Sequence, residues 1–401
     1  MASTFPITRR NMLIMGGVVA GASLSAFHGA AAEPFVDAGQ FRTQRSSDRD
    51  VLRKAIEQWV RNGTGVLRLE RGCTYDLGIV TDRPSLFEIS GLRNAVLDGN
   101  GAIIRARSAK GNVWNLLSFS NAANLDIINL TASDSAYVDE AWGMKMIVLQ
   151  PGGGGTHSVG LANILAVRAL AMVWAQGPVQ NRVRGINFGV NCRARHCYYA
   201  LGCENQGDEV HGVIDSVNCR RAYIAYGVEG HDLEINIHHD GLQVAAGAQS
   251  AVLVKSYGRA TRNVTLRLGF TGSLPYYAQM KNDRLSGACV TIEHQSADGE
   301  PSSIDGIDID VNIADGIEDP FGAYLAAITS IGRDGSVERV TRNSWSRITI
   351  RGRTGKLRRI NTPSAPETPF TLKILGDADR IIATAAHRNI NIDRAPVKSL
   401  R

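Results

Sequence analysis

Apolar and polar residues alternate along most of this chain, in short runs that end in glycine or asparagine. Seven such runs resemble one another and cover residues 95–101, 124–130, 232–237, 263–268, 307–311, 347–351 and 389–393. Each run predicts a β-strand with one dry face and one wet face, joined by corners of positive φ. Apart from one long gap between the second and third, the runs recur about every 30 to 45 residues, which is typical of a coil of short strands.

One segment near the N-terminus has helical periodicity instead. In residues 48–61, six apolar side chains fall on one helical stripe: Val51, Leu52, Ala55, Ile56, Trp59 and Val60. Asn62 and Gly63 end this pattern, and alternating runs follow at residues 65–69 and 72–75. The sequence therefore predicts one short amphipathic helix ahead of a long series of strands.

The start of this series resembles a known fold. The helix, the G-x-L-x-L and G-x-x-Y strands and the run F-E-I-S-G-L-R-N-A-V-L-D-G-N-G-A-I-I at residues 87–104 are similar to the first coils of the right-handed parallel β-helix of the pectate-lyase-like superfamily. The resemblance covers residues 48–395 and implies an all-β solenoid of about nine to eleven coils. It also implies that the helix, within residues 33–62, caps the first coil and covers its open edge. The β-helix would then span residues 63–395, with a tail at residues 396–401.

Composition and charge agree with many short strands and narrow the range of partners. The chain has 401 residues, of which 44% are apolar, only 6% are aromatic and 42 are glycine. Its formal net charge of +6 suits an acidic polymer without requiring one. Lysines and arginines are scattered rather than grouped with aromatic residues, which argues against a nucleic-acid surface. We therefore expect a polysaccharide partner, no nucleic acid, and a monomer.

The first 32 residues resemble a twin-arginine (Tat) export signal. Arg9 and Arg10 precede an apolar, glycine-rich run that reaches Phe27, and three alanines at residues 30–32 suit a signal peptidase. A general secretory signal or a retained anchor is the alternative reading. No later segment has about 18 uninterrupted apolar residues, so we expect no membrane association after signal removal. The predicted location is the periplasm or the extracellular medium.

Cysteines and acidic residues offer two candidate metal sites, and neither has a recognisable motif. The six cysteines are Cys73, Cys192, Cys197, Cys203, Cys219 and Cys289. Their spacing lacks a second zinc-type pair, which favours buried packing or one disulfide. The acidic residues Asp305, Asp308, Asp310, Asp315, Glu318 and Asp319 could bind calcium, but no glycine-spaced calcium loop is present, so solvated charge is favoured. No cofactor is predicted with certainty, and calcium stays an alternative.

Titratable residues are densest between residues 204 and 240, which hold four of the nine histidines. Elimination across a uronate needs a base, a cation for the carboxylate and an acid for the leaving oxygen. The candidate catalytic residues are His231, His238, His239, Tyr226, Arg221 and Lys281. The candidate substrate-binding residues are Asp232, Asp240, Tyr276, Tyr277 and Arg284. We expect the loop at residues 276–284 to fold over the strand at residues 233–237.

A purely structural interpretation competes with this one. Alternation directs Glu234, Asn236 and His238 outward, where charged residues of successive coils can form a surface ladder. Alignment of the repeats predicts that Glu234 stands beside Thr265 and Asp308. The same alignment places Asn236 beside Arg267, Asp310 and Arg351. Such ladders stabilise a sheet only slightly.

The catalytic motifs of the superfamily are missing from the sequence. There is no D-D pair of the polygalacturonase type, Gly230-His231-Asp232 matches only part of one element, and no R-x-P-x-x-R of the pectate lyases occurs. We therefore predict a carbohydrate-active protein that acts on an acidic polysaccharide, with β-elimination as the leading hypothesis. Glycoside hydrolysis with carboxylates such as Glu204, Asp208 and Glu229 is one alternative. Binding of a polysaccharide without turnover is the other.

Overall fold

The structure, a computed structural model, describes most of the chain after Glu33. The described residues are 34–81, 84–137, 142–241, 243–244, 250–257, 259–277, 288–295, 303–319, 323–331, 346–351, 358–361, 370–375, 381–383 and 390–395. All of the helices and strands belong to one unit, Phe35–Arg401. The predicted export signal, Lys281 and Arg284 lie outside the described residues. In the part of the chain described, no helix has the length and apolar character needed to cross a membrane.

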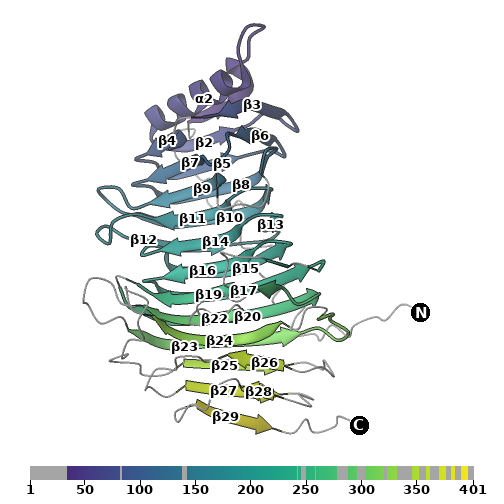
Figure 1. Cartoon of the computed structure of the whole chain (residues 1–401). Coiled ribbons are helices and arrows are strands. Elements are labelled where there is room, and N and C mark those ends of the chain that lie inside the picture. The colour runs from purple at the N-terminus through teal and green to yellow at the C-terminus, as the bar shows by residue number, and fades with distance from the viewer. Residues whose placement is uncertain are drawn as a thin grey trace, which may run out of the picture. The chain divides into compact units, whose positions relative to one another are not determined.

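Two long parallel sheets run the length of this unit (Figure 1). The main path of the first, sheet A, consists of β1 (Phe35–Asp37), β2 (Gly65–Arg68), β5 (Arg93–Asp98), β8 (Ala123–Asp134), β10 (Thr156–Val167), β12 (Val183–Phe188), β15 (Asp208–Val217), β17 (Glu229–His239), β20 (Thr261–Gly272), β23 (Ile304–Ile313), β25 (Ser346–Arg351), β27 (Phe370–Leu375) and β29 (Ile390–Ala395). Beside this path lie β3 (Thr74–Val80), β6 (Ile103–Ser108) and β13 (Arg193–Arg195).

Sheet B provides the other wall. Its members are β4 (Ser85–Ser90), β7 (Val113–Ser120), β9 (Gly143–Gln150), β11 (Ala171–Gln176), β14 (Tyr199–Glu204), β16 (Arg221–Tyr226), β19 (Ser250–Ser256), β22 (Ala288–Gln295), β24 (Tyr324–Ile331), β26 (Arg358–Asn361) and β28 (Ile381–Ala383). A short pair, β18 (Gln243–Val244) and β21 (Tyr276–Tyr277), lies outside both sheets.

The chain winds from a strand of sheet B around a corner into a strand of sheet A, and then into the next coil. All of the pairings within both sheets are parallel, for example between β15 and β17 and between β14 and β16. The eleven strands of sheet B agree with the expected nine to eleven coils. The predicted parallel β-helix is therefore confirmed. The seven repeats of the sequence are seven strands of sheet A, and the long gap between two of them contains β10, β12 and β15.

The predicted helix caps the first coil. Helix α2 (Asp48–Asn62) begins after Ser47, whose hydroxyl accepts a hydrogen bond from the backbone N–H of Asp50. It ends at Gly63, which has a φ of 73°. Its apolar stripe is buried against the first strands, and Trp59 Nε1 donates to the carbonyl of Gly65 over 3.0 Å. The helix thus covers one end of the apolar interior.

The interior is filled by the inward residues of both sheets, and asparagines stack at the corners. In β17, the inward residues Leu233, Ile235 and Ile237 are buried and alternate with exposed ones, as predicted. Asn163 donates from Nδ2 to Asn129 Oδ1 over 2.9 Å, and Asn191 donates to Asn163 in the same way. These corner residues have positive φ, which asparagine tolerates better than most residues. Stacked amides therefore satisfy corner polar groups from one coil to the next.

Two predictions about the strands need correction. β17 pairs with β20 so that Glu234 lies opposite Arg267 and Asn236 opposite Gly269. The expected alignment was two residues out of register, an error that alternation hides because a shift of two keeps every side chain on the same face. Arg351 likewise lies opposite Asn312 rather than Asp310. The pairs Thr265–Asp308 and Arg267–Asp310 were correct.

Candidate functional site

His231 and His239 point into the apolar interior, which separates them from any polymer on the surface. Each has only 1% of its surface exposed. His231 forms hydrogen bonds with the Tyr223 hydroxyl at 2.7 Å and the Gly207 carbonyl at 2.5 Å. Burial lowers the pKa of both histidines to about 4. Within the described part of the chain, both ring nitrogens of His239 lack a partner. Both histidines are therefore core residues, which corrects the expectation that they face the groove.

His238 and Asp240 lie on the outer side of sheet A. His238 Nδ1 is 3.0 Å from the Thr271 hydroxyl, and Nε2 is 3.0 Å from Asp240 Oδ1. Asn218 donates to Asp240 Oδ2 over 2.9 Å, and this bond together with His238 lowers the pKa of Asp240. The arrangement is a hydrogen-bonded strand end, as the structural interpretation expected.

Asp232 is also outward, and it is paired. Arg267 Nη2 lies 2.6 Å from Asp232 Oδ1, with about half of each side chain exposed. One coil further, Arg347 Nε donates to Asp308 Oδ1 over 2.9 Å. This face of sheet A is a charge ladder. Among the described residues, no three histidine, cysteine, aspartate or glutamate side chains converge as a metal site requires.

The cysteines and the β21 tyrosines are mostly packing residues. Cys192, Cys197, Cys203, Cys219 and Cys289 are buried, Cys73 is partly buried, and all six are free thiols. The Tyr277 ring is buried and its hydroxyl donates to the Arg220 carbonyl over 2.6 Å, while the Tyr276 side chain is partly buried. The Tyr277 hydroxyl is therefore bound to the backbone of Arg220 and not to His231 or His238.

Tyr226 and Arg221 occupy a different surface, the outer face of sheet B. Here aromatic and charged side chains gather, and we call the set the aromatic cluster: Lys145, Trp174, Tyr199, Glu204, Tyr226 and Tyr257. The buried guanidinium of Arg221 lies 5.9 Å from the centre of the Tyr199 ring. Two of the predicted catalytic residues thus lie on sheet B, whereas His238 lies on sheet A.

Trp174 is the centre of the aromatic cluster. Its ring lies over Gly202 of the neighbouring strand, where an added Cβ would overlap the ring. The Tyr199 ring meets it edge to face with centroids 4.9 Å apart, and Lys145 Nζ lies 4.6 Å from its ring centre. Trp174 Nε1 donates to Glu204 Oε2 over 3.3 Å. Glycine at position 202 therefore makes room for a flat ring on the outside of the solenoid.

The polar groups of the cluster form a short chain across neighbouring strands. The Tyr226 hydroxyl lies near the Glu204 carboxylate of the neighbouring strand, and burial together with this carboxylate raises the Tyr226 pKa. Lys255, opposite Tyr226 on the next strand, forms a 2.9 Å ion pair with the buried Glu293. Burial lowers the pKa of Lys145, although the Glu204 charge opposes this effect. The cluster therefore offers an acceptor, a donor and a cation side by side.

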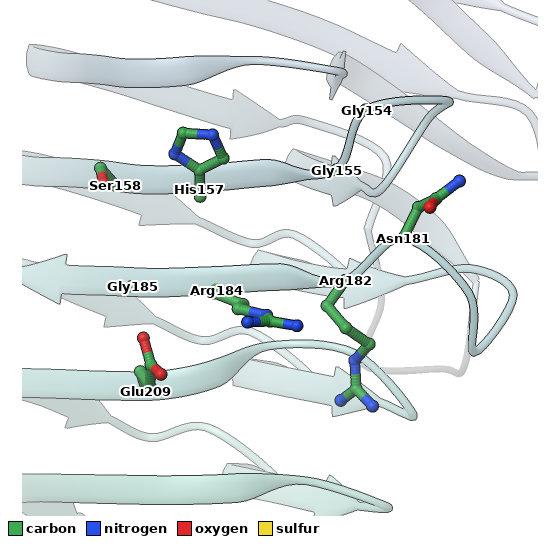
Figure 2. Close-up of a pocket in the computed structure, with 9 residues that line it drawn as sticks. All are labelled: Gly154, Gly155, His157, Ser158, Asn181, Arg182, Arg184, Gly185 and Glu209. Atoms are coloured by element: carbon green, nitrogen blue, oxygen red, sulfur yellow. The ribbon is translucent and has the colours of Figure 1, made fainter.

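Around the corner, at the beginning of the next strands of sheet A, lies a polar pocket of about 530 Å³ (Figure 2). Its lining residues are Gly154, Gly155, His157, Ser158, Asn181, Arg182, Arg184, Gly185 and Glu209. Glu204 ends β14 in the aromatic cluster, and β15 begins at Asp208 beside this pocket. Both features therefore belong to the same few coils.

A buried carboxylate supports this corner. Asp208 Oδ1 lies 2.7 Å from Arg182 Nη2 and 3.1 Å from Arg259 Nη1, and it accepts the backbone N–H of Glu229 over 3.0 Å. Burial raises the pKa of Asp208 to about 6 even though the Arg182 guanidinium opposes the shift. Because every oxygen contact of Asp208 is used within the corner, this residue holds the corner together.

Sequence reasoning missed Trp174, Lys145 and Glu293 as members of a site. The strands of Lys145 and Trp174 are largely apolar runs, in which alternation cannot show which residues face outward. The available signal was the long gap in the repeat, because the coils of this gap carry both the pocket and most of the cluster.

Comparison with known proteins identifies the fold. The structure is similar to the catalytic domain of a GH87 α-1,3-glucanase in complex with tetrasaccharides, with a TM-score of 0.52 and 13% identity, over 92% of this chain and 69% of that one. The A-module of a mannuronan C-5 epimerase from Azotobacter vinelandii matches with a TM-score of 0.43 and 13% identity, over 90% of this chain and 99% of that one. No protein-family profile and no curated sequence matches. The comparison shows the fold alone.

Proposed function

We propose that this protein cleaves an acidic polysaccharide by β-elimination on the outer face of sheet B. The aromatic cluster carries the proposal, because charged residues are rarely buried without a reason, and on the outside of this solenoid Glu293 is buried and Lys145 is half-buried. Aromatic walls with a few convergent polar groups are typical of ligand sites. The shared fold with a glucanase that takes tetrasaccharides gives further support for a polysaccharide.

The Glu204–Tyr226 pair supplies the two proton transfers. Glu204 takes the proton next to the sugar carboxylate, and the electrons form a carbon–carbon double bond as the glycosidic oxygen leaves. Tyr226, protonated because its pKa is raised, gives its proton to that oxygen. Because the two residues lie opposite each other on neighbouring strands, the proton then passes from Glu204 back to Tyr226. Lys145, whose Nζ lies over the Trp174 ring and donates to the Gln176 amide oxygen over 2.9 Å, is the cation that neutralises the sugar carboxylate.

The spacing of carboxylates favours elimination over hydrolysis. Hydrolysis needs two carboxyl groups about 5 to 9.5 Å apart on either side of the bond. Glu293 shares the outer row with Glu204 but lies three strands away, about 14 Å by strand spacing, and it is bound to Lys255. The other carboxylates considered, Asp208 and Glu229, belong to the corner and to sheet A. The described residues thus fit a donor and an acceptor at one position better than two opposed acids.

An assay with oligomers of uronic acids tests the proposal through the ultraviolet absorbance of unsaturated products. Tyr226→Phe removes the proton donor and should lower kcat about 100- to 1,000-fold, within the range of acid–base catalysis. Tyr257→Phe is the matched control, since it keeps the ring packed edge-on against Tyr226 and should change kcat less than about twofold. Reducing ends without unsaturation would favour hydrolysis, and binding without either product would favour a non-catalytic role.

The proposal also covers the location and the oligomeric state of the protein. We propose that the protein works in the periplasm or outside the cell after removal of residues 1–32, and that it does so as a monomer without nucleic acid. The arginine pair and the apolar run of the N-terminus support the export step. N-terminal sequencing of the exported protein checks this, and a start near residue 33 is the expected result.

A further inference from the structure

The pocket on sheet A brings together side chains of opposite charge. His157, Arg184 and Glu209 lie on the adjacent strands β10, β12 and β15, and the register places His157 beside Arg184 (Figure 2). His157, Arg184 and Glu209 are all exposed. Within the part of the chain that the structure describes, neither Arg184 nor Glu209 takes part in an ion pair. One cation and one anion therefore face the same space without neutralising each other.

The backbone of the pocket is unusual for its position in the fold. From β5 to β23, the second or third residue of the sheet A strand has a left-handed conformation, and in the coils outside the pocket this residue is Asn94, Asn124, Gly230, Asn263 or Gly306. In the pocket the same position holds Ser158 with a φ of 57° and Glu209 with a φ of 55°. A glutamate seldom adopts this conformation, and such strained residues gather at functional sites. The strain directs Glu209 to the pocket where an asparagine or glycine would suit the fold better.

The walls of the pocket consist of a fixed arginine and of glycines that leave room for a ligand. Arg182, with about a tenth of its side chain exposed, is fixed by its 2.7 Å contact with Asp208. Gly185 provides the floor, where a Cβ would come within 3.3 Å of the Ser158 nitrogen. Gly154 and Gly155 form the rim, and a side chain at Gly154 would overlap the Asn121 amide. The volume of about 530 Å³ falls within the range of small-ligand sites.

We propose that this pocket binds one acidic sugar unit. Arg184, assisted by His157, pairs with the oxyanion of the sugar, and Glu209 accepts hydrogen bonds from its ring hydroxyls. The guanidinium suits a carboxylate or a sulfate, whereas an unpaired carboxylate in the same pocket disfavours a bare inorganic anion. This inference rests on the proposed function in one respect only, that the polymer on sheet B is acidic. The pocket would then hold an acidic unit at the corner beside the aromatic cluster.

The test compares glucuronate with glucose, which differ only in the carboxylate, by ligand-observed NMR on the mature chain. Glucuronate should bind at least 10-fold more tightly than glucose, and added salt should reduce this difference. Arg184→Gln should remove the difference and leave glucose binding unchanged. Arg195→Gln, which alters an exposed arginine of β13 outside the pocket, is the matched control and should change nothing. Equal binding of the two sugars, or an unchanged preference in Arg184→Gln, would overturn the proposal.

Further experiments identify the class of ligand that binds, and they distinguish the pocket proposal from the elimination proposal. Glu209→Gln keeps the length of the side chain and should weaken glucuronate and glucose alike, about 3- to 10-fold. If inorganic sulfate competes as well as glucuronate does, the pocket is a general anion site and the sugar assignment fails. Tyr226→Phe should leave glucuronate binding intact. If no polyuronate is cleaved but the preference that depends on Arg184 persists, the pocket proposal stands and the elimination proposal fails.

Discussion

Among the residues that the structure describes, the coils that contain β10, β12 and β15 include outward charged residues without ion-pair partners, in contrast to the pairs found in the coils that contain β17, β20 and β23. In the later coils several outward charges form ion pairs between neighbouring strands, as in Asp232 with Arg267 and Asp308 with Arg347. In the earlier coils Arg184 and Glu209 face a pocket without such partners. In the later coils the outward residues suit the fold, whereas in the earlier coils Arg184 and Glu209 do not. Departures of this kind are expected where residues serve a ligand rather than the fold.

Apart from the loss of kcat in Tyr226→Phe, the largest expected effect comes from filling the space under the Trp174 ring. Gly202→Ala adds a methyl group that overlaps the indole and displaces it. Oligouronate affinity should fall about 100-fold, or about 2.7 kcal/mol. Gly153→Ala is the control, because nothing lies within 4 Å of its added Cβ. Calorimetric titration of both variants gives the measurement, and unchanged affinity in Gly202→Ala would show that Trp174 does not contact the ligand.

The next effect concerns the interior of the regular coils. Because burial lowers the His239 pKa from about 6.5 to about 4, the unfolded chain takes up a proton first as the pH falls below 6.5. His239 should therefore cost about 2 kcal/mol of stability at pH 5 relative to pH 7, and His239→Leu should recover most of it. Stability to urea at both pH values checks this.

His231→Phe is the contrasting variant for that measurement. It loses the hydrogen bonds to Tyr223 and Gly207, so it should be less stable than the parent at pH 7, whereas His239→Leu should not. The same loss of stability at pH 7 in both variants would contradict the assignment of His239 as a core residue without partners.

A smaller effect of opposite sign is expected at the pocket. Glu209→Asn places a residue that accepts left-handed φ where the other coils already have asparagine or glycine. The free energy of unfolding should rise by about 1 kcal/mol while glucuronate binding falls. The reverse change, Asn263→Glu, should lower stability by a similar amount. If Glu209→Asn were destabilising, the strain at this position would have no functional explanation.

The smallest effect belongs to the charge ladder. Arg267→Gln removes the ion pair with Asp232, in which both side chains are about half exposed. Stability should change by less than about 0.5 kcal/mol, and cleavage should not change. A loss of activity in this variant would move the functional surface from sheet B to the middle of sheet A.

Much of the fold could be predicted because its signals are local. The stripe from Val51 to Trp59 and the alternation in Leu233, Ile235 and Ile237 each reflect burial on one side of an element. The strands β10 and β12 were missed as repeats, since Gly160 and Gly185 interrupt the alternation. The register error at Glu234 has the same origin: alternation indicates which face a residue occupies but not which residue of the next coil lies beside it.

The sequence by itself determined the capping helix, the coil of alternating strands and the concentration of titratable residues between residues 204 and 240. Only the tertiary structure decided which of those residues meet. It buried His231 and His239, paired Asp232, and brought Lys145, Trp174 and Glu204 together from three different coils. The physical reason is that contacts between coils depend on the register and on the corners, which are set by pairing over distances of about 30 residues along the chain.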